Sequence, residues 1–164
     1  MESLILNSQQ LSQKIQRIAY QLYEEHQDEQ TLVIAGVKGN GYIFALEINA
    51  FFETICSIKT TVIEVDIDKA KPFTNPIICN DQGIENQALV LVDDVLNSGG
   101  TLIASVHHFI KKPMKKIKTV VLIDRNHRTF PIAADFVGMS LATTFQEHVE
   151  VRSENGKLKE VVLS

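Results

Sequence analysis

The sequence predicts an α/β fold, in which a parallel, twisted sheet is flanked by helices and followed by a small C-terminal subdomain. Short apolar segments, partly β-branched, alternate with longer segments whose apolar residues recur at helical spacing. This order produces parallel strands joined by right-handed crossovers. The most continuous apolar segment, residues 88–92, ends in two acids and a glycine-containing loop. A ligand site in such a sheet lies at the carboxyl ends of its strands, so these polar residues are the first candidates for function.

The first third of the chain reads as helix, strand, loop and helix. Ser8 is expected to cap the first helix, which a polar run at 24–28 ends. Residues 31–35 are apolar and partly β-branched, which predicts a buried strand. The turn-rich loop 36–41 then opens the second helix. The apolar residues of the two helices recur at helical spacing and are Leu11, Ile15, Ile18, Ala19, Leu22, Ile43, Phe44, Leu46, Ile48 and Phe51.

The middle of the chain repeats the alternation. Residues 60–65 predict a strand, and the stretch 66–86, with prolines and a glycine among charged residues, is expected to be an exposed excursion. After the strand at 88–92, a helix is expected from about Thr101 to Lys111, stopped by Pro113. The remaining strand-like segments are 117–123, 135–138, 148–152 and 158–163, of which the last three suit a small appended subdomain.

Composition limits the class of protein and its compartment. No repeat or linker divides the 164 residues, so a single domain is expected. A formal net charge of −4 argues against a surface wholly committed to nucleic acid. Cys56 and Cys79 fit neither a disulfide framework nor a zinc site, which favours reduced thiols and a cytoplasmic location. The N-terminus lacks a signal-like pattern, and no segment reaches the roughly 18 apolar residues that a membrane span needs.

The segment VLVDDVLNSGGT at 90–101 carries the chemistry. Adjacent acids at a strand end, Asp93 and Asp94, offer oxygens to the hydroxyls of a ribose and through them to Mg²⁺. The small residues that follow can point backbone N–H groups at a phosphate, helped by the N-terminus of the helix that begins there. The alternative is that the acids cap the helix and the glycines make a turn. The ordered combination favours a ribose 5-phosphate site.

This segment resembles the ribose-phosphate signature of type I phosphoribosyltransferases. Three further segments share the resemblance: Ile5-Leu6-Asn7, the loop GVKGNG at 36–41, and the long run VLIDRNHRTFPIAADFVG at 121–138. The likeness covers nearly the whole chain and is closest to the group of bifunctional pyrimidine-operon regulators and uracil phosphoribosyltransferases. It implies one domain, 1–164, with a core at about 8–124 and a hood, a subdomain over the base, made of residues 1–7 and about 125–164.

The resemblance also implies an activity and a set of site residues. The activity is transfer of the 5-phosphoribosyl group from phosphoribosyl pyrophosphate to a nucleobase, with uracil favoured, with Mg²⁺ as cofactor and with release of pyrophosphate. Asp93, Asp94 and Lys38 would be catalytic, and the two acids would hold the metal indirectly through ribose hydroxyls or water. The binding residues would be Asp93, Asp94, Asn97, Ser98, Gly99, Gly100 and Thr101 for ribose 5-phosphate, Val37, Lys38, Gly39 and Arg125 for pyrophosphate, and Phe136 and Val137 for the base.

Some of these assignments have structural alternatives, and the sequence departs from the family pattern. Lys38 could be a solvated lysine in a turn, and Phe136 could belong to a core. The excursion at 66–76 contains no arginine to close over the pyrophosphate, so Lys69 or Lys71 would have to substitute as point charges. Two asparagines also differ from the pattern: Asn97 stands where purine-using relatives place an acid, and Asn40 replaces a basic residue.

A second hypothesis is a regulator that senses phosphoribosyl pyrophosphate or a nucleotide, controls RNA or a partner protein, and has weak or no turnover. The basic run at 111–118 could contact RNA phosphates, but cations at a helix end complement its dipole and stay solvated, which is the favoured interpretation. The resemblance implies a homodimer or higher homo-oligomer. A third hypothesis is a nucleotide-binding subunit whose apolar edge serves dimer formation.

Overall fold

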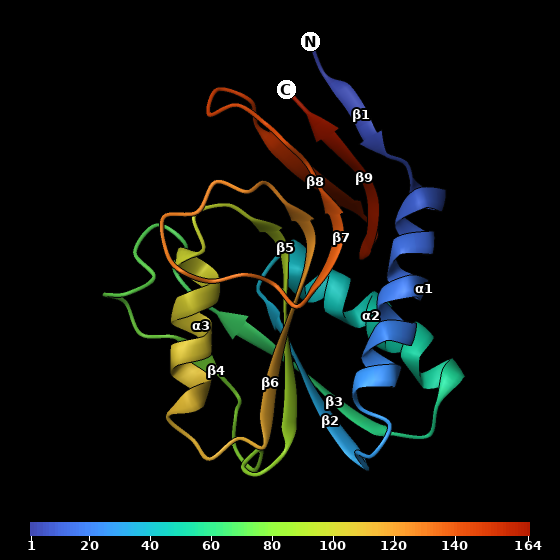
Figure 1. Ribbon diagram of the computed structural model, residues 1–164, viewed down its shortest axis with the longest axis vertical. Coiled ribbons are helices and arrows are strands. Elements are labelled where there is room, and N and C mark those ends of the chain that lie inside the picture. The colour runs from blue at the N-terminus through green and yellow to red at the C-terminus, as the bar shows by residue number, and fades with distance from the viewer.

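Five parallel strands form the centre of the main sheet. The computed structural model describes all residues, 1–164, and the main sheet has the order β4-β3-β2-β5-β6-β7, in which only β4 runs antiparallel to its neighbour. The predicted α/β fold with a helix-flanked parallel sheet is confirmed (Figure 1). The strands of this sheet are β2 (Thr31–Val37), β3 (Lys59–Asp66), β4 (Ile78–Cys79), β5 (Ala88–Leu96), β6 (Lys116–Asp124) and β7 (Phe136–Ser140).

Helices cover both faces of this sheet, because its central strands are apolar on both sides. Helices α1 (Ser8–Glu25) and α2 (Asn40–Ile55) pack on one face and α3 (Gly100–Ile110) on the other (Figure 1). Alternate residues of β5 divide between the two cores: Val90 packs with the α1 and α2 side, and Leu91 with the α3 side. The sheet is therefore buried and its strand ends are fixed in position.

A second sheet joins the two ends of the chain. It contains β1 (Ser3–Leu6), β9 (Lys157–Leu163) and β8 (Val149–Glu154) in the antiparallel order β1-β9-β8. Figure 1 shows it above α1 and α2, next to the upper end of the main sheet. Apolar residues of β8 and β9, such as Val151 and Val161, join the same core as α1 and α2. The small sheet is thus packed onto the body of the protein.

Two details differ from the sequence prediction. The cap of α1 is Asn7 and not Ser8, because the Asn7 side chain accepts from Gln10 N at 2.9 Å while Gln10 Oε1 accepts from Asn7 N at 2.9 Å. The segment 135–138, expected in the appended subdomain, contributes β7 to the main sheet. It pairs in parallel with β6, where Gly138 lies so close to the Leu122 carbonyl that a Cβ would meet it at 2.5 Å.

The excursion after β3 is exposed, as expected, but it is organised. The Asp68 carboxylate accepts hydrogen bonds from Ala70 N at 3.0 Å, from Lys71 N at 3.3 Å and from Asn75 Nδ2 at 2.7 Å. These contacts hold a turn directly after Lys69.

None of the three helices combines the length and the apolar composition that a membrane span requires.

Candidate active site

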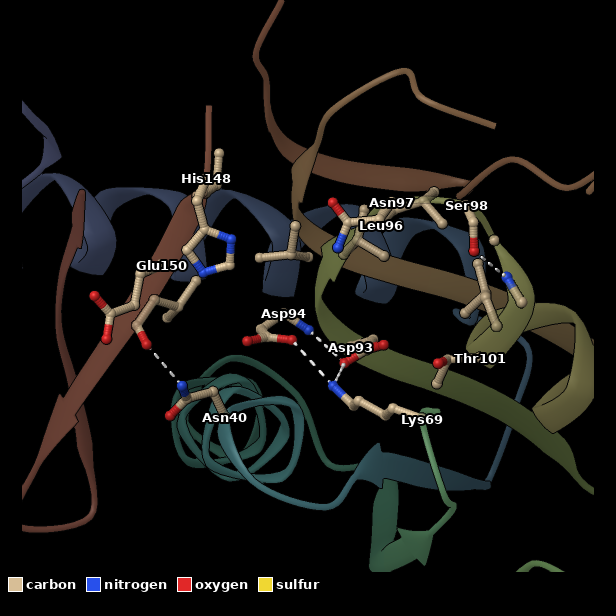
Figure 2. Close-up of a pocket in the computed structure, with 17 residues that line it drawn as sticks. Asn40, Lys69, Asp93, Asp94, Leu96, Asn97, Ser98, Thr101, His148 and Glu150 are labelled. Atoms are coloured by element: carbon tan, nitrogen blue, oxygen red, sulfur yellow. Dashed lines mark hydrogen bonds and ion pairs between the residues drawn. The ribbon is translucent and has the colours of Figure 1, made fainter. Parts of the chain in front are cut away.

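A polar cavity of about 470 Å³ lies at the carboxyl end of β5. Its floor is the end of β5 and the loop into α3, and β8 of the small sheet forms the opposite wall (Figure 2). Every residue predicted to hold ribose 5-phosphate lines it. The full lining is Asn40, Lys69, Asp93, Asp94, Val95, Leu96, Asn97, Ser98, Gly99, Gly100, Thr101, Leu102, Val121, His148, Val149, Glu150 and Val151.

The acid pair is held in place by β5. The Asp93 side chain is only 5% exposed and accepts a hydrogen bond from Asp94 N at 2.8 Å. The Lys69 ammonium, from the excursion after β3, reaches Oδ1 of Asp93 at 3.4 Å and Oδ1 of Asp94 at 3.6 Å (Figure 2). One cation therefore faces two carboxylates inside the cavity.

Burial dominates the electrostatics of this cluster. It raises the pKa of Asp93 well above the ordinary carboxyl range, and repulsion from the Asp94 carboxylate adds to the rise. The charge of Lys69 opposes it. Burial alone would lower the pKa of Lys69, but the attraction of Asp93 and Asp94 outweighs it, and the net shift is upward. The acids are thus short of positive charge, so the cavity favours a further cation.

The loop between β5 and α3 is shaped to hold an anion. Gly99 has a φ of 89°, in the left-handed region, and the helix begins at the next residue. The Ser98 hydroxyl accepts from Gly100 N at 3.2 Å, which tightens the turn. The first turn of α3 contains no acid that would repel an anion. The loop and the start of α3 line the cavity, so the positive end of the helix would favour an anion bound there.

The donors in the cavity fit a Mg²⁺ ion that is shared with a ligand. No group of three or more His, Cys, Asp or Glu side chains is placed to hold a metal. Mg²⁺ commonly takes one or two carboxylates and completes its shell with substrate oxygens and water. Asp93 and Asp94 supply that number of carboxylates. The residues therefore suit a metal that arrives with a polyhydroxylated, phosphorylated ligand.

Comparison with known proteins identifies the family. The model of the phosphoribosyl transferase domain matches residues 2–154. The chain belongs to the phosphoribosyltransferase family. A protein of Haemophilus ducreyi named "Bifunctional protein PyrR" is 30% identical over 164 residues, covering 94% of this chain and 92% of that protein. One of the same name from Clostridium kluyveri is 33% identical over 159 residues, covering 92% and 90%. The resemblance read from the ribose-phosphate motif is confirmed.

Solved structures agree in fold. The hypoxanthine phosphoribosyltransferase of Trypanosoma cruzi superposes with a TM-score of 0.80 at 15% identity, covering 98% of this chain and 95% of that one. A hypoxanthine-guanine phosphoribosyltransferase of Bacillus anthracis gives 0.72 at 23% identity, covering 88% and 86%. At these identities the likeness establishes the architecture of this phosphoribosyltransferase and not its substrate.

The residues predicted for pyrophosphate lie beside the cavity but do not line it. Val37 is buried at the end of β2, and Gly39 has a φ of 95° at the start of α2. The Lys38 side chain is 57% exposed and pairs with Asp66 at 3.2 Å. Only the next residue, Asn40, reaches the cavity, and it donates to the Val151 carbonyl at 2.7 Å. A role for Lys38 at the leaving group stays a prediction.

Arg125 is buried, and its guanidinium is already occupied. Nε donates to Thr143 Oγ1 at 3.0 Å, and Nη1 donates to Asn97 Oδ1 at 3.0 Å. Nη2 donates to the carbonyls of Thr144 at 3.2 Å and Glu147 at 2.6 Å. Four of its hydrogen bonds are thus made within the protein, and Arg125 does not line the cavity. In this arrangement it ties the phosphate loop to the segment between β7 and β8.

The residues predicted for the base, Phe136 and Val137, lie on β7 and not at the cavity. Both are half-buried, and they pack against opposite cores of the main sheet. The Val137 carbonyl already accepts one hydrogen bond, from Nη2 of Arg17 at 3.1 Å. Contact with a base through these two residues stays a prediction that the arrangement does not favour.

Sequence reasoning missed the wall that β8 provides. His148 and Glu150 line the cavity opposite the acids, and Figure 2 shows the His148 ring on the side of Asp94. The polar side chains at 148 and 150 alternate with buried Val149 and Val151, which is a signal for a strand with two different faces. No sequence signal places that strand over the end of β5, because the placement depends on how the small sheet packs.

Proposed function

We propose that this phosphoribosyltransferase binds phosphoribosyl pyrophosphate in the cavity at the end of β5 and transfers the phosphoribosyl group to a nucleobase. One observation carries the proposal: the acid pair and the anion-binding loop open into the same cavity. Acids suit the two ribose hydroxyls, and the loop at 97–101 suits the 5-phosphate. The two parts of one ligand would therefore be held by consecutive residues of a single strand–loop–helix unit.

The reaction would be a displacement at C1 of the ribose. The bond from C1 to the pyrophosphate oxygen breaks and pyrophosphate leaves with its electron pair, while a ring nitrogen of the base forms the new bond and its proton passes to solvent. Asp93 and Asp94 would orient the ribose, and Lys69 would move from the acids to the departing pyrophosphate as those acids engage the ligand. Bound Mg²⁺ would supply further positive charge to the pyrophosphate oxygens. Catalysis by this chain is thus mainly positioning and charge.

A pyrimidine, with uracil first, is the base we assign. Support comes from the family resemblance of the whole chain and from Asn97, an amide at the position where purine-using relatives carry an acid. The pattern of the residues therefore favours a pyrimidine over hypoxanthine or guanine.

A second candidate is a sensor that binds the ligand with little turnover. It is supported by how few cations face the cavity: Lys69 lines it, whereas Lys38 pairs with Asp66 and Arg125 is engaged elsewhere. A lysine is a point charge and holds a pyrophosphate less firmly than an arginine fork. Binding could therefore be retained while the rate of the chemical step is low.

Calorimetric titration tests the proposal. Phosphoribosyl pyrophosphate is added with and without Mg²⁺ to the wild type and to Asp93→Asn/Asp94→Asn, and pyrophosphate release is then followed with uracil, hypoxanthine, guanine and adenine. Asp28→Asn, exposed at the opposite end of the sheet, is the matched control. Mg²⁺-dependent binding that only the double variant loses supports the site, and release with one base names the acceptor. Binding without release supports the sensor, and no binding by the wild type rejects both.

The proposal includes a homo-oligomer and a cytoplasmic location, and it gives an RNA partner little support. In the basic run at 111–118, four lysines already pair with carboxylates: Lys112 with Asp81, Lys115 with Glu29, and both Lys116 and Lys118 with Glu25. This pairing supports a solvated protein surface over an RNA contact. Cys56 and Cys79 are free thiols, as suits the cytoplasm. A homodimer or higher homo-oligomer is inferred from the family resemblance, and light scattering would test it.

A further inference from the structure

The wall of the cavity carries an imidazole that no other part of the protein engages. His148 lies directly before β8 and lines the cavity. Its backbone is fixed by two hydrogen bonds with Ser164, from His148 N to Ser164 O at 2.7 Å and from Ser164 N to His148 O at 2.9 Å. The His148 side chain is exposed and, unlike the rings of His108 and His127, its ring has no hydrogen-bond partner in the protein. Both ring nitrogens are therefore available to a ligand.

The proposed reaction needs a proton acceptor beside the ligand. A ring nitrogen that attacks C1 has to lose its proton, and a positioned side chain that accepts this proton speeds the step. Lys69 has no acceptor atom while it is charged, and its pKa is raised. Asp93 and Asp94 are assigned to the ribose hydroxyls, and the Asn97 amide is not basic. The ionisable side chains that line the cavity are Lys69, Asp93, Asp94, His148 and Glu150, so the last two remain.

Glu150 is the less suitable of these two acceptors. Its Oε2 accepts a hydrogen bond from Arg152 Nε at 3.0 Å and lies 2.8 Å from Arg152 Nη2. A carboxylate beside a guanidinium is stabilised in its charged form and accepts a proton less readily. In Figure 2 the Glu150 carboxylate points away from Asp94, whereas the His148 ring lies on the side of Asp94. An imidazole also gains and loses a proton close to neutral pH, so His148 is the better acceptor.

The position of His148 matches the reacting end of the sugar. Ser98 and Thr101 lie on one side of the acid pair and His148 on the other (Figure 2). In ribose 5-phosphate, C1 and the carbon that carries the phosphate arm flank the ring oxygen, so C1 and the phosphate lie at opposite ends of the sugar. With the phosphate on the loop and the hydroxyls on the acids, C1 would be directed towards the side of His148. A base that attacks C1 would then come within reach of the imidazole.

We propose that His148 is a catalytic residue that takes the proton from the attacking ring nitrogen of the nucleobase. The inference rests on the proposed function. As the nitrogen forms its bond to C1, the bond from C1 to pyrophosphate breaks and pyrophosphate leaves with its electron pair. The lone pair of an imidazole nitrogen accepts the proton of the base, and the electron pair of the broken N–H bond stays on the base. Because the His148 side chain is exposed, the imidazolium can then pass the proton to solvent.

The test compares uracil with 5-fluorouracil, whose ring N–H groups are more acidic because fluorine withdraws electrons. A more acidic base depends less on a proton acceptor. In His148→Ala we expect the single-turnover rate to fall by about 100-fold with uracil, and by at least about threefold less with 5-fluorouracil. The Kd of phosphoribosyl pyrophosphate and the thermal stability should stay close to those of the wild type. His107→Ala, which removes an exposed histidine on α3 outside the cavity, is the matched control and should change neither rate.

The outcomes distinguish this inference from the proposed function. If the wild type binds phosphoribosyl pyrophosphate and turns over uracil, an unchanged rate in His148→Ala overturns the inference alone. An equal fall with both bases also overturns it, because His148 would then act on the leaving group or on the structure. A loss of sugar binding as large as the loss of rate would assign His148 to the sugar and has the same consequence. A wild type that binds no phosphoribosyl pyrophosphate, or binds it and releases no pyrophosphate, rejects the proposed transfer and this inference with it.

Discussion

The ammonium of Lys69 lies 3.4 Å from Oδ1 of Asp93, although the two residues belong to different strand–loop units of the sheet. The same ammonium is 3.6 Å from Asp94. A cation from the excursion after β3 is therefore bound to the carboxylates that we assign to the ribose and, indirectly, to Mg²⁺. Lys69 and a bound divalent ion would compete for the same oxygens.

Replacing Lys69 should separate binding from turnover. In Lys69→Met the acids lose their counter-ion, so we expect Mn²⁺, used alone as a probe, to bind more tightly by about 3- to 10-fold, an estimate based on a partly exposed ion pair. Pyrophosphate release should fall by about 10- to 100-fold, since the leaving group loses a cation. Calorimetry measures the affinity for Mn²⁺, and a coupled assay measures the rate of pyrophosphate release. Lys71→Met, in the same excursion but outside the cavity, is the control, and equal effects in both variants would contradict the assignment.

Asp93 should make the protein less stable as the pH rises. Its pKa is raised in the folded state, mainly by burial, so the folded protein binds more protons at this residue than the unfolded chain does. Stability therefore falls as the pH rises from the unfolded carboxyl pKa of about 4 towards neutrality. Asp93→Asn removes this pH-dependent contribution to the free energy of unfolding. The variant should gain thermal stability over the wild type at pH 7, on the order of 1 kcal/mol, and less at pH 4.

The same titration affects binding in the opposite direction. Ribose hydroxyls and Mg²⁺ need ionised acids, so the affinity for phosphoribosyl pyrophosphate should weaken as the pH falls below 7. A calorimetric series between pH 5 and pH 8 with the wild type and Asp28→Asn measures this. An affinity that does not change with pH would show that Asp93 is ionised throughout, against the raised pKa.

Gly99 should be intolerant of a side chain. A Cβ there would meet Ile132 Cγ2 at 2.6 Å, and the φ of 89° is strained for any other residue. Gly99→Ala should destabilise the protein by about 1–3 kcal/mol and weaken phosphate binding by the reshaped loop. Gly83→Ala is a matched control, because Gly83 has a φ of 77° but no atom within 4 Å of its Cβ position. The difference between the two unfolding free energies isolates the contact with Ile132.

The ribose-phosphate residues could be predicted from the sequence because they are consecutive. Residues 93–101 end a strand, turn and start a helix, and this local order brings acids and backbone N–H groups to one side. The alternation of strands and helices similarly predicted a parallel sheet flanked by helices, and its apolar segments predicted a buried centre. The ribose-phosphate residues are neighbours in the chain, and the strands of the sheet are joined by crossovers that are almost always right-handed. Both features can therefore be predicted from the order of the residues.

The other parts of the site depend on contacts between distant segments. Arg125 bonds to Asn97 across 28 positions and Lys69 to Asp93 across 24, and neither pairing leaves a local pattern. The resemblance placed Arg125 at the pyrophosphate, whereas its donors face the protein. The wall that includes His148 depends on the packing of a sheet made from both chain ends. Such placements follow from tertiary packing, which a single sequence does not reveal.

A substitution of Phe136 tests whether this residue binds the base or only packs in the core. It is half-buried on β7, packs against the core beside α1 and does not line the cavity. Phe136→Leu should therefore destabilise the protein by about 1–2 kcal/mol and leave the KM for the base within about twofold of the wild type. If the ring stacks on the base, the KM should instead rise several-fold with little change in stability. Denaturant unfolding and initial rates at saturating phosphoribosyl pyrophosphate give the two quantities. Val162→Ala in β9, a core change outside the cavity, shows how far a loss of packing alone affects the KM.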